Sequence, residues 1–276
     1  MNSNLLWHDL RNGIVRKRYL LIPVFFLLPC FNCLQTANGM MEHGTWLDYY
    51  LTCFIGEMPQ ILDGFMHDGL VIPYRWLFAV TGGLILNLDY MISDLETEGI
   101  QFILQTKKRS SWFISKGIWN LISSLLYFLG AGLTALIFTV LSGGAISLSR
   151  LTCVGRMFFQ GLLMEKDTEV LWKLYLCGIG IPFFSFCVCN LLQMTLCLYT
   201  KPAVSLILLL GLTVFSIYIP YPWIIGNGMM GIRNMLFVES GQFWLSVICP
   251  AAIGVVCWII GVKRFKRMDL LGQEVL

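Results

Sequence analysis

Long apolar runs, separated by shorter polar stretches, recur along the whole chain. A helix needs roughly 20 apolar residues to cross a hydrocarbon core about 30 Å thick, and six of the runs reach or approach that length. The pattern therefore predicts an all-α integral membrane protein with a single transmembrane domain, residues 19–262. The predicted spans are 19–37, 72–92, 117–141, 174–198, 203–219 and 243–262.

Composition supports a lipid environment. Of the 276 residues, 57% are hydrophobic and 13% are charged, whereas a soluble domain carries about 25% charged residues. The net charge of +3 is small, and the basic residues lie at the ends of apolar runs instead of along one face. This distribution indicates a membrane topology and gives no reason to expect nucleic acid as a partner.

The distribution of Lys and Arg predicts the orientation. Cytoplasmic segments carry an excess of basic residues, so the side with more of them is expected to face the cytoplasm. With the N-terminus inside, that side holds Arg11, Arg16, Lys17, Arg18, Lys107, Lys108, Arg109, Lys116, Lys201, Lys263, Arg264, Lys266 and Arg267. The outer side holds only Arg150, Arg156, Lys166, Lys173 and Arg233. Both termini are therefore expected in the cytoplasm, with 263–276 as a tail.

Residues 1–18 are expected to form an amphipathic helix that lies in the membrane interface. Leu6, Trp7, Leu10 and Ile14 follow helical spacing, and basic residues at 16–18 follow them and would meet anionic lipid. A frayed basic leader is the alternative. The first apolar run is interpreted as an uncleaved helix, because the preceding basic region is long and no A-x-A site follows.

Two outer segments are amphipathic or irregular. Residues 38–71 contain five acids, no Lys or Arg, and several aromatic residues, so short helices against the outer leaflet or a partner are expected. Proline and glycine residues interrupt 219–242, which predicts a re-entrant or extracellular helical cap. Pro182 and Pro250 fall inside predicted spans and are expected to kink them.

Uncharged polar residues inside the spans are the candidates for a substrate pathway, because each must find a partner in lipid. Hydrogen bonding between helices is an equally good explanation. The charged exceptions, Arg75 and Asp89, lie near span ends, and this disfavours ion-coupled transport. The candidates are Asn32, Gln35, Asn120, Asn190 and Gln193.

No catalytic constellation accompanies these features. The three histidines lie outside the predicted spans, and the sequence contains neither H-E-x-x-H nor G-x-S-x-G. Cys30 and Cys33 match C-x-x-C without a second ligand pair, so no metal site is expected. Cys53 and Cys153 would both face outside, and the sequence is compatible with a disulfide between them or with two free thiols. Without a Gly-Lys dipeptide there is no phosphate loop, so any ATP hydrolysis belongs to another polypeptide.

The cytoplasmic segment 93–116 has the most specific pattern. Acidic residues precede Gly99, and a basic cluster at 107–109 and then Lys116 follow an apolar stripe. The stripe residues fall at i, i+3 and i+4, which predicts a short amphipathic helix under the bilayer. The stripe consists of Ile100, Ile103 and Leu104, with Phe102 beside it.

This segment resembles the one that follows the second helix in permease subunits of ABC-2 type ATP-binding-cassette transporters. The comparable positions are Glu96, Gly99, Leu104, Arg109 and Lys116. The usual proline is replaced by Lys107-Lys108. The resemblance extends to the layout of the whole chain, from the N-terminal interfacial helix to the interrupted outer region before the last span.

The resemblance implies a transport subunit without enzymatic activity of its own. Glu96 to Arg109 would form a coupling helix that docks on a separate nucleotide-binding subunit, with Ile100, Phe102, Ile103 and Leu104 as its apolar insert. Two ATPase copies, which hold the ATP and Mg²⁺, would serve two permease copies, with a homodimer favoured, in a bacterial plasma membrane. The alternative is an amphipathic linker on the membrane surface.

The expected cargo is amphipathic or hydrophobic, because the spans offer almost no fixed charge. Small six-helix permeases of this type include phenol-soluble modulin exporters and lantibiotic self-protection systems, so peptide is favoured over lipid or drug. An ATP-independent channel or secondary transporter is the rival function, disfavoured by the lack of intramembrane acids and repeated halves. A membrane scaffold or enzyme is a third, disfavoured by the missing catalytic groups.

Overall fold

The computed structural model describes residues 3–14, 17–59, 73–99, 103, 109–149, 151–152 and 168–267. Every regular element within these ranges is a helix, so the predicted all-α fold is confirmed for this part of the chain. The predicted residues 263–276 are described only as far as Arg267, where the last helix ends.

Five helical stretches are long and apolar enough to cross a membrane, as a multi-pass membrane protein requires. They are Lys17–Gly39, Tyr74–Asp94, Ser111–Leu141, Leu171–Leu196 and Phe243–Arg267. The predicted run 203–219 also forms a helix, α11 (Pro202–Tyr218), but it is shorter, with 17 residues.

Several spans are built from more than one element. The long elements are η1 (Lys17–Leu21) with α2 (Ile22–Gly39), α4 (Tyr74–Asn87) with α5 (Tyr90–Asp94), α7 (Arg109–Leu141), α9 (Thr168–Tyr175) with η4 (Leu176–Gly180) and α10 (Ile181–Leu196), and α14 (Phe243–Arg267). The short ones are α1 (Ser3–Ile14), α3 (Trp46–Phe54), η3 (Leu95–Gly99), α12 (Ile225–Gly228) and α13 (Gly231–Glu239).

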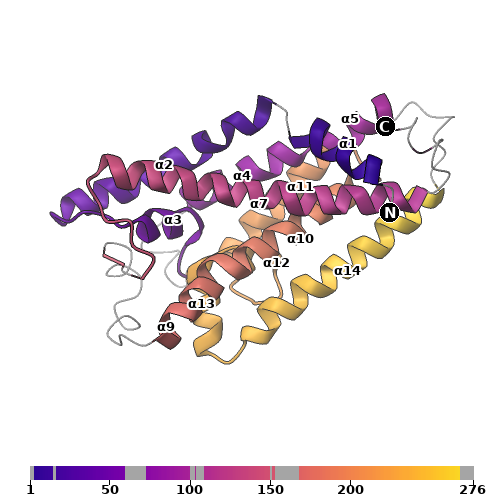
Figure 1. Cartoon of the computed structure of the whole chain (residues 1–276). Helices are drawn as coiled ribbons and strands as arrows, with labels where there is room; N and C mark the ends of the chain where they lie inside the picture. Colours follow the sequence, from indigo (N-terminus) through magenta and orange to yellow (C-terminus); the bar gives the residue numbers. More distant parts are fainter. Residues whose placement is uncertain are drawn as a thin grey trace.

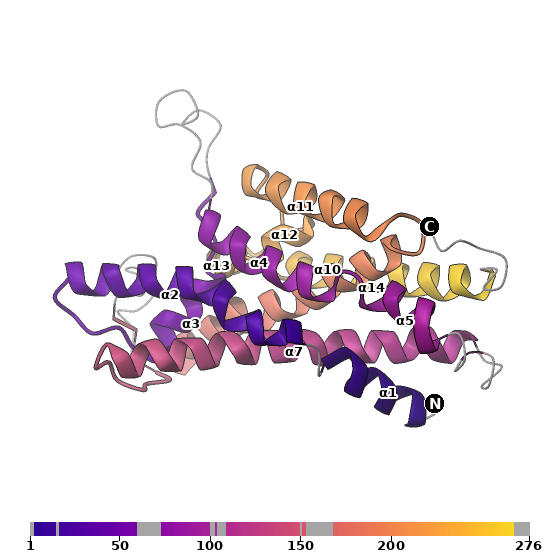
Figure 2. The ribbon, with the colours of Figure 1, turned by 90° about the horizontal axis from the view of Figure 1, so that it is seen from above.

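The helices form an elongated bundle with two distinct ends (Figures 1 and 2). One end holds α1, α5, the start of α7 and the C-terminal end of α14, and we call it the basic end. The opposite end holds α3, α9 and α13. Segments that the sequence places on one side of a membrane therefore lie together at one end of the molecule.

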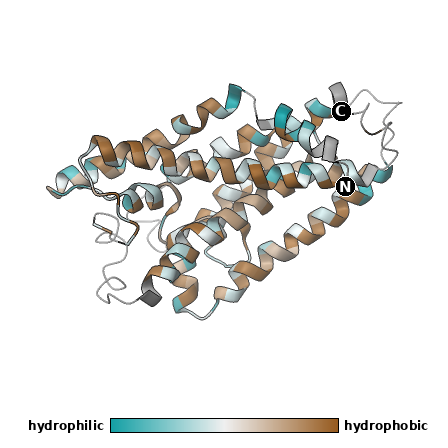
Figure 3. Cartoon of the chain, in the orientation of Figure 1, coloured by the Kyte–Doolittle hydropathy of each residue, from teal (hydrophilic) through white to brown (hydrophobic). Residues whose placement is uncertain are grey.

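Hydrophobic residues predominate along the long helices, and hydrophilic residues gather toward the helix ends (Figure 3). Leu133 of α7, Ile207 of α11 and Val255 of α14 expose 63%, 68% and 59% of their surface. A soluble protein rarely exposes continuous apolar surface of this kind. These side chains are the ones that would face lipid.

Small residues and aromatic rings bring the helices together inside the bundle. A Cβ on Gly83 of α4 would lie 2.2 Å from the Phe186 ring of α10, so the two helices approach closely only because residue 83 is glycine. Tyr127 of α7 stacks on the same Phe186 ring, with centroids 5.5 Å apart. The Phe54 and Phe128 rings stack at 4.2 Å and join α3 to α7.

Short helices occur in both segments that the sequence predicts to lie outside, and the two prolines predicted to kink spans differ in their surroundings. The region 38–71 contains α3, and the region 219–242 contains α12 and α13, so short helices are confirmed in both. Pro182 lies in the first turn of α10, directly after the π-helical η4 of the same span, and both features are typical of places where a helix bends. Pro250 lies inside α14, which continues past it.

Candidate functional site

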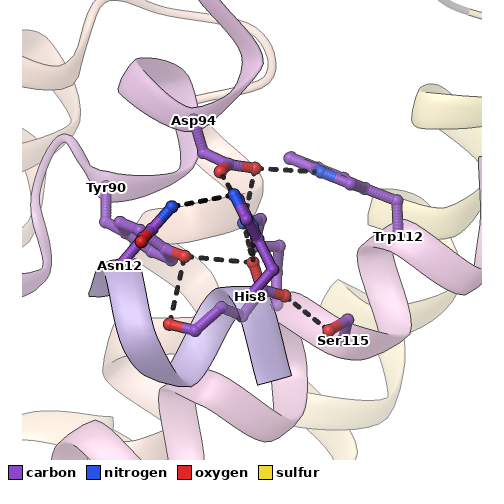
Figure 4. Close-up of polar contacts among 8 residues, drawn as sticks. His8, Asn12, Tyr90, Asp94, Trp112 and Ser115 are labelled. Atoms are coloured by element: carbon purple, nitrogen blue, oxygen red, sulfur yellow. Dashed lines mark hydrogen bonds and ion pairs between the residues drawn. The ribbon is translucent and has the colours of Figure 1, made fainter. Parts of the chain in front are cut away.

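Three elements meet at the basic end and bury a group of charged side chains. Asp9 of α1, Asp94 at the end of α5 and Lys116 of α7 expose only 0%, 3% and 0% of their surface. We call these three residues the charge cluster. Figure 4 shows how α1, α5 and α7 direct polar side chains toward one point. The sequence places Lys116 at the entrance to the third span and among the positions comparable to the ABC-2 permease pattern, but it does not predict a buried ion pair for it.

Lys116 provides the positive charge at the centre of the cluster. Its Nζ lies 2.6 Å from Asp94 Oδ2 and also pairs with Asp9 Oδ1. The same Nζ lies 4.3 Å from the ring centroid of Tyr90 and 5.0 Å from that of Trp112, both in the range of cation–π attraction. The buried ammonium therefore faces two carboxylates and two aromatic rings.

Hydrogen bonds satisfy the two carboxylates as well. Trp112 Nε1 donates to Asp94 Oδ2 at 3.1 Å, and the Tyr90 hydroxyl donates to Asp9 Oδ1 at 3.0 Å. The Ser115 hydroxyl donates to the other oxygen of Asp9. A buried charge is costly unless it is both paired and hydrogen-bonded. This arrangement meets both conditions and so holds α1, α5 and α7 in one geometry.

His8 lies beside the cluster, within ion-pair distance of both of its carboxylates. Its Nδ1 is 3.8 Å from one oxygen of Asp9 and 3.8 Å from one oxygen of Asp94, and its Nε2 is 2.8 Å from Asn12 Nδ2. Ligand atoms of His8, Asp9 and Asp94 lie within 4.8 Å of one another. A metal ion would compete with the Lys116 ammonium for these carboxylates, so the donor set fits an internal ion pair better than a metal centre.

A glycine on α1 permits this close approach. A Cβ on Gly13 would lie 2.2 Å from Trp119 Nε1 of α7 and 2.8 Å from the Tyr90 ring of α5. Asp9 and Gly13 are one helical turn apart, so both lie on the face of α1 that packs against α7. The spacing of Asp9 and Gly13 is the feature of the sequence that could have indicated that Asp9 lies on a packed face of the helix.

Arg18 and Asp89 form a second ion pair at this end, but a much more exposed one. Arg18 donates from both terminal nitrogens to the Asp89 carboxylate, with Nη2 at 2.8 Å from Oδ2. The two side chains expose 45% and 37% of their surface. Exposed pairs contribute about 0–1 kcal/mol. The charge cluster, not this pair, is therefore the main polar link at the basic end.

The structure describes the predicted coupling segment in part. Glu96 lies exposed on η3, and Gly99 is buried where a Cβ would lie 2.6 Å from Asp94 Oδ2. Ile103 exposes 4% of its surface and packs in an apolar cluster with Leu95 and Trp112. Ile103 therefore contributes to the protein's own packing. Ile100, Phe102, Leu104 and the side chain of Arg109, the first residue of α7, lie outside the described residues.

Three of the pathway candidates link helices. Asn120 Nδ2 donates to the Cys187 carbonyl at 3.0 Å, and Gln193 Nε2 donates to the Leu84 carbonyl at 3.2 Å. Asn190 Nδ2 donates to Ser124 Oγ at 3.1 Å. All three candidates are buried, and their bonds join α7, α10 and α4, as interhelical hydrogen bonding predicts.

The other two candidates lie on α2 and are less buried. Asn32 is half-buried and Gln35 is exposed. The structure therefore places Asn120 and Asn190 between α7 and α10, and Gln193 between α10 and α4, whereas Asn32 and Gln35 lie on α2.

At the opposite end, Arg233 of α13 is buried in a cradle of carbonyl groups. It donates to Ser216 and Ile217, in the last turn of α11, at 2.5 and 2.6 Å, to the Glu57 carbonyl at 3.0 Å, and to the Asn227 side chain. Carbonyls at a helix C-terminus lack intrahelical donors and carry partial negative charge. Burial lowers the pKa of Arg233 to about 10, which leaves the guanidinium charged at neutral pH.

Three of the four cysteines considered in the sequence analysis, Cys30, Cys33 and Cys53, are buried thiols in the structure. Cys30 and Cys33 both lie inside α2, and Cys53 Sγ of α3 is 3.9 Å from Cys30 Sγ. Burial raises the pKa of Cys53, which keeps it in the thiol form. Cys153, the possible disulfide partner of Cys53, lies outside the described residues.

Comparison with known proteins places this architecture in a family. Residues 20–271 match a family whose members are described as proteins of unknown function, DUF2705. The chain belongs to the DUF2705 family. The matched region contains Asp94 and Lys116, whereas Asp9 and the rest of α1 precede it. No curated protein and no solved structure shows significant similarity to this DUF2705 chain.

Proposed function

We propose that this DUF2705 chain is the permease subunit of an ATP-driven exporter of the ABC-2 type, powered by a separate nucleotide-binding subunit. The observation that carries the proposal is the buried Asp94–Lys116 ion pair at the two ends of the segment 93–116. Through Asp9, the same pair also connects that segment to α1. The segment is thus anchored at both ends to three helices.

This anchoring is what a coupling element needs. A segment that receives force from a partner must pass it to the spans, and a flexible attachment would dissipate the movement. Breaking a buried ion pair by removing one partner costs about 3–5 kcal/mol, far more than an exposed pair provides. A displacement of Asp94 would therefore move α5 and α7 together with α1. Glu96, exposed next to the anchored end, would contact the ATPase.

The arrangement of α1 supports an interfacial role for it. Trp7 exposes 69% of its surface, and Arg11 is exposed, while Asp9 faces the bundle. An amphipathic helix with an exposed Trp at the end of the spans suits the headgroup layer. In this proposal, α1 lies along the cytoplasmic surface and joins the interface to the coupling segment.

We count α11 as the sixth span. Its 17 residues extend about 26 Å at 1.5 Å per residue, a few Å short of a typical hydrocarbon core. Flanking residues that reach the interfaces accommodate such a mismatch. Lys201 precedes α11, and Tyr221 and Trp223 follow it, in the places that interfacial anchors occupy. Six spans keep both termini on the cytoplasmic side.

The partners follow from the same proposal. Two ATPase subunits would supply the ATP and Mg²⁺ sites, and two permease copies, most simply identical, would enclose a pathway in a bacterial plasma membrane. An amphipathic peptide is the cargo that suits a bundle whose described buried span residues, apart from the charge cluster at the basic end, are apolar or uncharged. Asn120, Asn190 and Gln193 would then act by holding α4, α7 and α10 together during transport.

Co-purification tests the proposal. Affinity-tagged protein, extracted from its native membrane in mild detergent, should retain an ATPase with a G-x-x-x-x-G-K-[ST] loop. Phe102→Glu should lose that ATPase while the protein still inserts in the membrane. Met41→Glu, at a position 97% exposed at the opposite end, is the matched control and should retain it. Failure of any such ATPase to co-purify with the unaltered protein would overturn the proposal.

A further inference from the structure

A groove of about 680 Å³ opens at the end of the bundle opposite the charge cluster. Most of its lining residues lie on the connection from α11 to α12 and on the C-terminal part of α13 and the turn that follows it. This volume falls in the range of small-molecule binding sites, about 300–1,000 Å³. Its lining includes Pro59, Pro220, Tyr221, Trp223, Phe237 and Glu239.

Two aromatic rings form a rigid, accessible wall of this groove. Tyr221 and Trp223 stack with centroids 4.4 Å apart and planes within 10°. They nevertheless expose 51% and 50% of their surface. Pro220 precedes this pair and Pro222 separates its members, so the backbone that carries the rings has restricted φ angles. A preorganised aromatic surface of this kind can accept apolar groups or a cation on its ring faces.

The charge at the groove is negative. Glu239 is the only charged residue in the lining that the structure describes, and its side chain is exposed. Within 219–242 the only base is Arg233, which is buried in its cradle of carbonyl groups. Residues 38–71, which include Pro59, contain five acids and no Lys or Arg. A cation approaching this groove would therefore meet a carboxylate that no described residue of the lining neutralises.

From this combination we infer that the groove binds an amphipathic organic cation, with the positive charge beside Glu239 and the Tyr221–Trp223 stack. The apolar part of the cation lies along Phe237, Pro59 and Pro220. The inference also assigns the substrate class, because the transported cation would be a cationic amphipathic peptide. This assignment rests on the proposed function. Binding itself requires no ATPase, so it can be tested on the isolated protein.

Photo-crosslinking with a matched probe pair tests the inference. One probe is an alkyl benzophenone with a trimethylammonium group, and the other carries a carboxylate in its place. The purified protein is reconstituted in nanodiscs, illuminated with each probe, and the labelled peptides are mapped by mass spectrometry. The map of labelled peptides distinguishes probe bound in the groove from probe dissolved in the lipid, because dissolved probe of either charge labels lipid-facing peptides generally.

The cationic probe should label the peptides that contain Tyr221, Trp223 and Glu239 at least about threefold more than the anionic one, as expected for an exposed cation site. Glu239→Gln should remove most of this preference, and Trp223→Ala should reduce labelling by the cationic probe. Glu42→Gln, another carboxylate at this end, should change neither. Equal labelling by the two probes, or an unchanged preference in Glu239→Gln, would show that the aromatic pair serves as an interfacial anchor only and would overturn the inference.

Discussion

The ammonium of Lys116 lies 2.6 Å from the carboxylate of Asp94, and both side chains are almost completely buried. Asp94 ends α5, and Lys116 lies within the first turns of α7. The ion pair therefore joins the two ends of the polar segment between these residues. Asp9 pairs with the same ammonium and so connects α1 to α5 and α7. A structural link of this kind explains how events at the segment 93–116 would reach several helices at once.

Removing the cation should destabilise the whole bundle. Lys116→Met leaves the carboxylates of Asp9 and Asp94 buried without a counter-charge, and we expect a loss of about 3–5 kcal/mol in the free energy of unfolding. Thermal denaturation in detergent measures the effect. Lys201→Met, an exposed lysine at the same end, should change stability by less than about 0.5 kcal/mol.

A second substitution separates charge from packing in that experiment. Adding Asp94→Asn to Lys116→Met removes one of the two unpaired carboxylate charges, so the double variant should regain part of the lost stability. If Lys116→Met were as stable as Lys201→Met, the charge cluster would not be the link that holds α1, α5 and α7 together.

Arg233 should be essential to the opposite end of the bundle. Arg233→Met leaves the carbonyls of Ser216 and Ile217 without their donors, and each buried unpaired carbonyl costs about 1–3 kcal/mol. Arg233→Lys should restore only part of the stability, because an ammonium cannot reproduce the planar fork of donors. The melting temperature reports both variants. Arg75→Met, which among the described residues loses only its contacts with Tyr74, is the control and should melt near the unaltered protein.

The close contact between α4 and α10 makes a sharp prediction about two glycines. Gly83→Ala places a methyl group 2.2 Å from the Phe186 ring, so overpacking should cost about 1–3 kcal/mol. Gly211→Ala, in α11, has no atom within 4 Å of the new methyl group and should be neutral or raise stability by up to about 1 kcal/mol. Equal effects of the two substitutions on the melting temperature would contradict the packing of these helices.

Thiol labelling tests the proposed orientation. In a background without the ten native cysteines, Met41→Cys should react with a membrane-impermeant maleimide added to intact cells, because Met41 is 97% exposed at the end expected outside. Glu96→Cys, exposed at the basic end, should react only after the cells are opened. The reverse pattern would place the termini outside the cell.

Much of the fold could be predicted because a bilayer imposes strong constraints on sequence. Span length and apolarity located the five long helices, and the shorter apolar run at 203–219 forms α11. The acidic and aromatic content of 38–71 indicated α3. Boundaries were less accurate: α7 begins at Arg109 rather than 117, because polar residues at the basic end continue the helix beyond the apolar core.

The charge cluster could not be predicted, because its members are far apart in the sequence. Asp9 and Lys116 are separated by 107 residues, and only packing of α1 against α7 brings them together. Asp9 is a charged residue within the segment 1–18, which the sequence predicts to be an interfacial helix, yet it is fully buried. Likewise, the sequence located Asn120, Asn190 and Gln193 inside spans but could not choose between a pathway and helix contacts, since that depends on which helices are neighbours.

Site-specific photo-crosslinking tests the central claim most directly. A photoreactive amino acid placed at Glu96, exposed beside the anchored end of the coupling segment, should capture an ATPase that carries a G-x-x-x-x-G-K-[ST] loop in native membranes. The same amino acid at Met41, exposed at the opposite end, should not capture it. Absence of such an ATPase from the Glu96 crosslinks, or its equal capture from Met41, would contradict the account of this protein as a partner-driven permease.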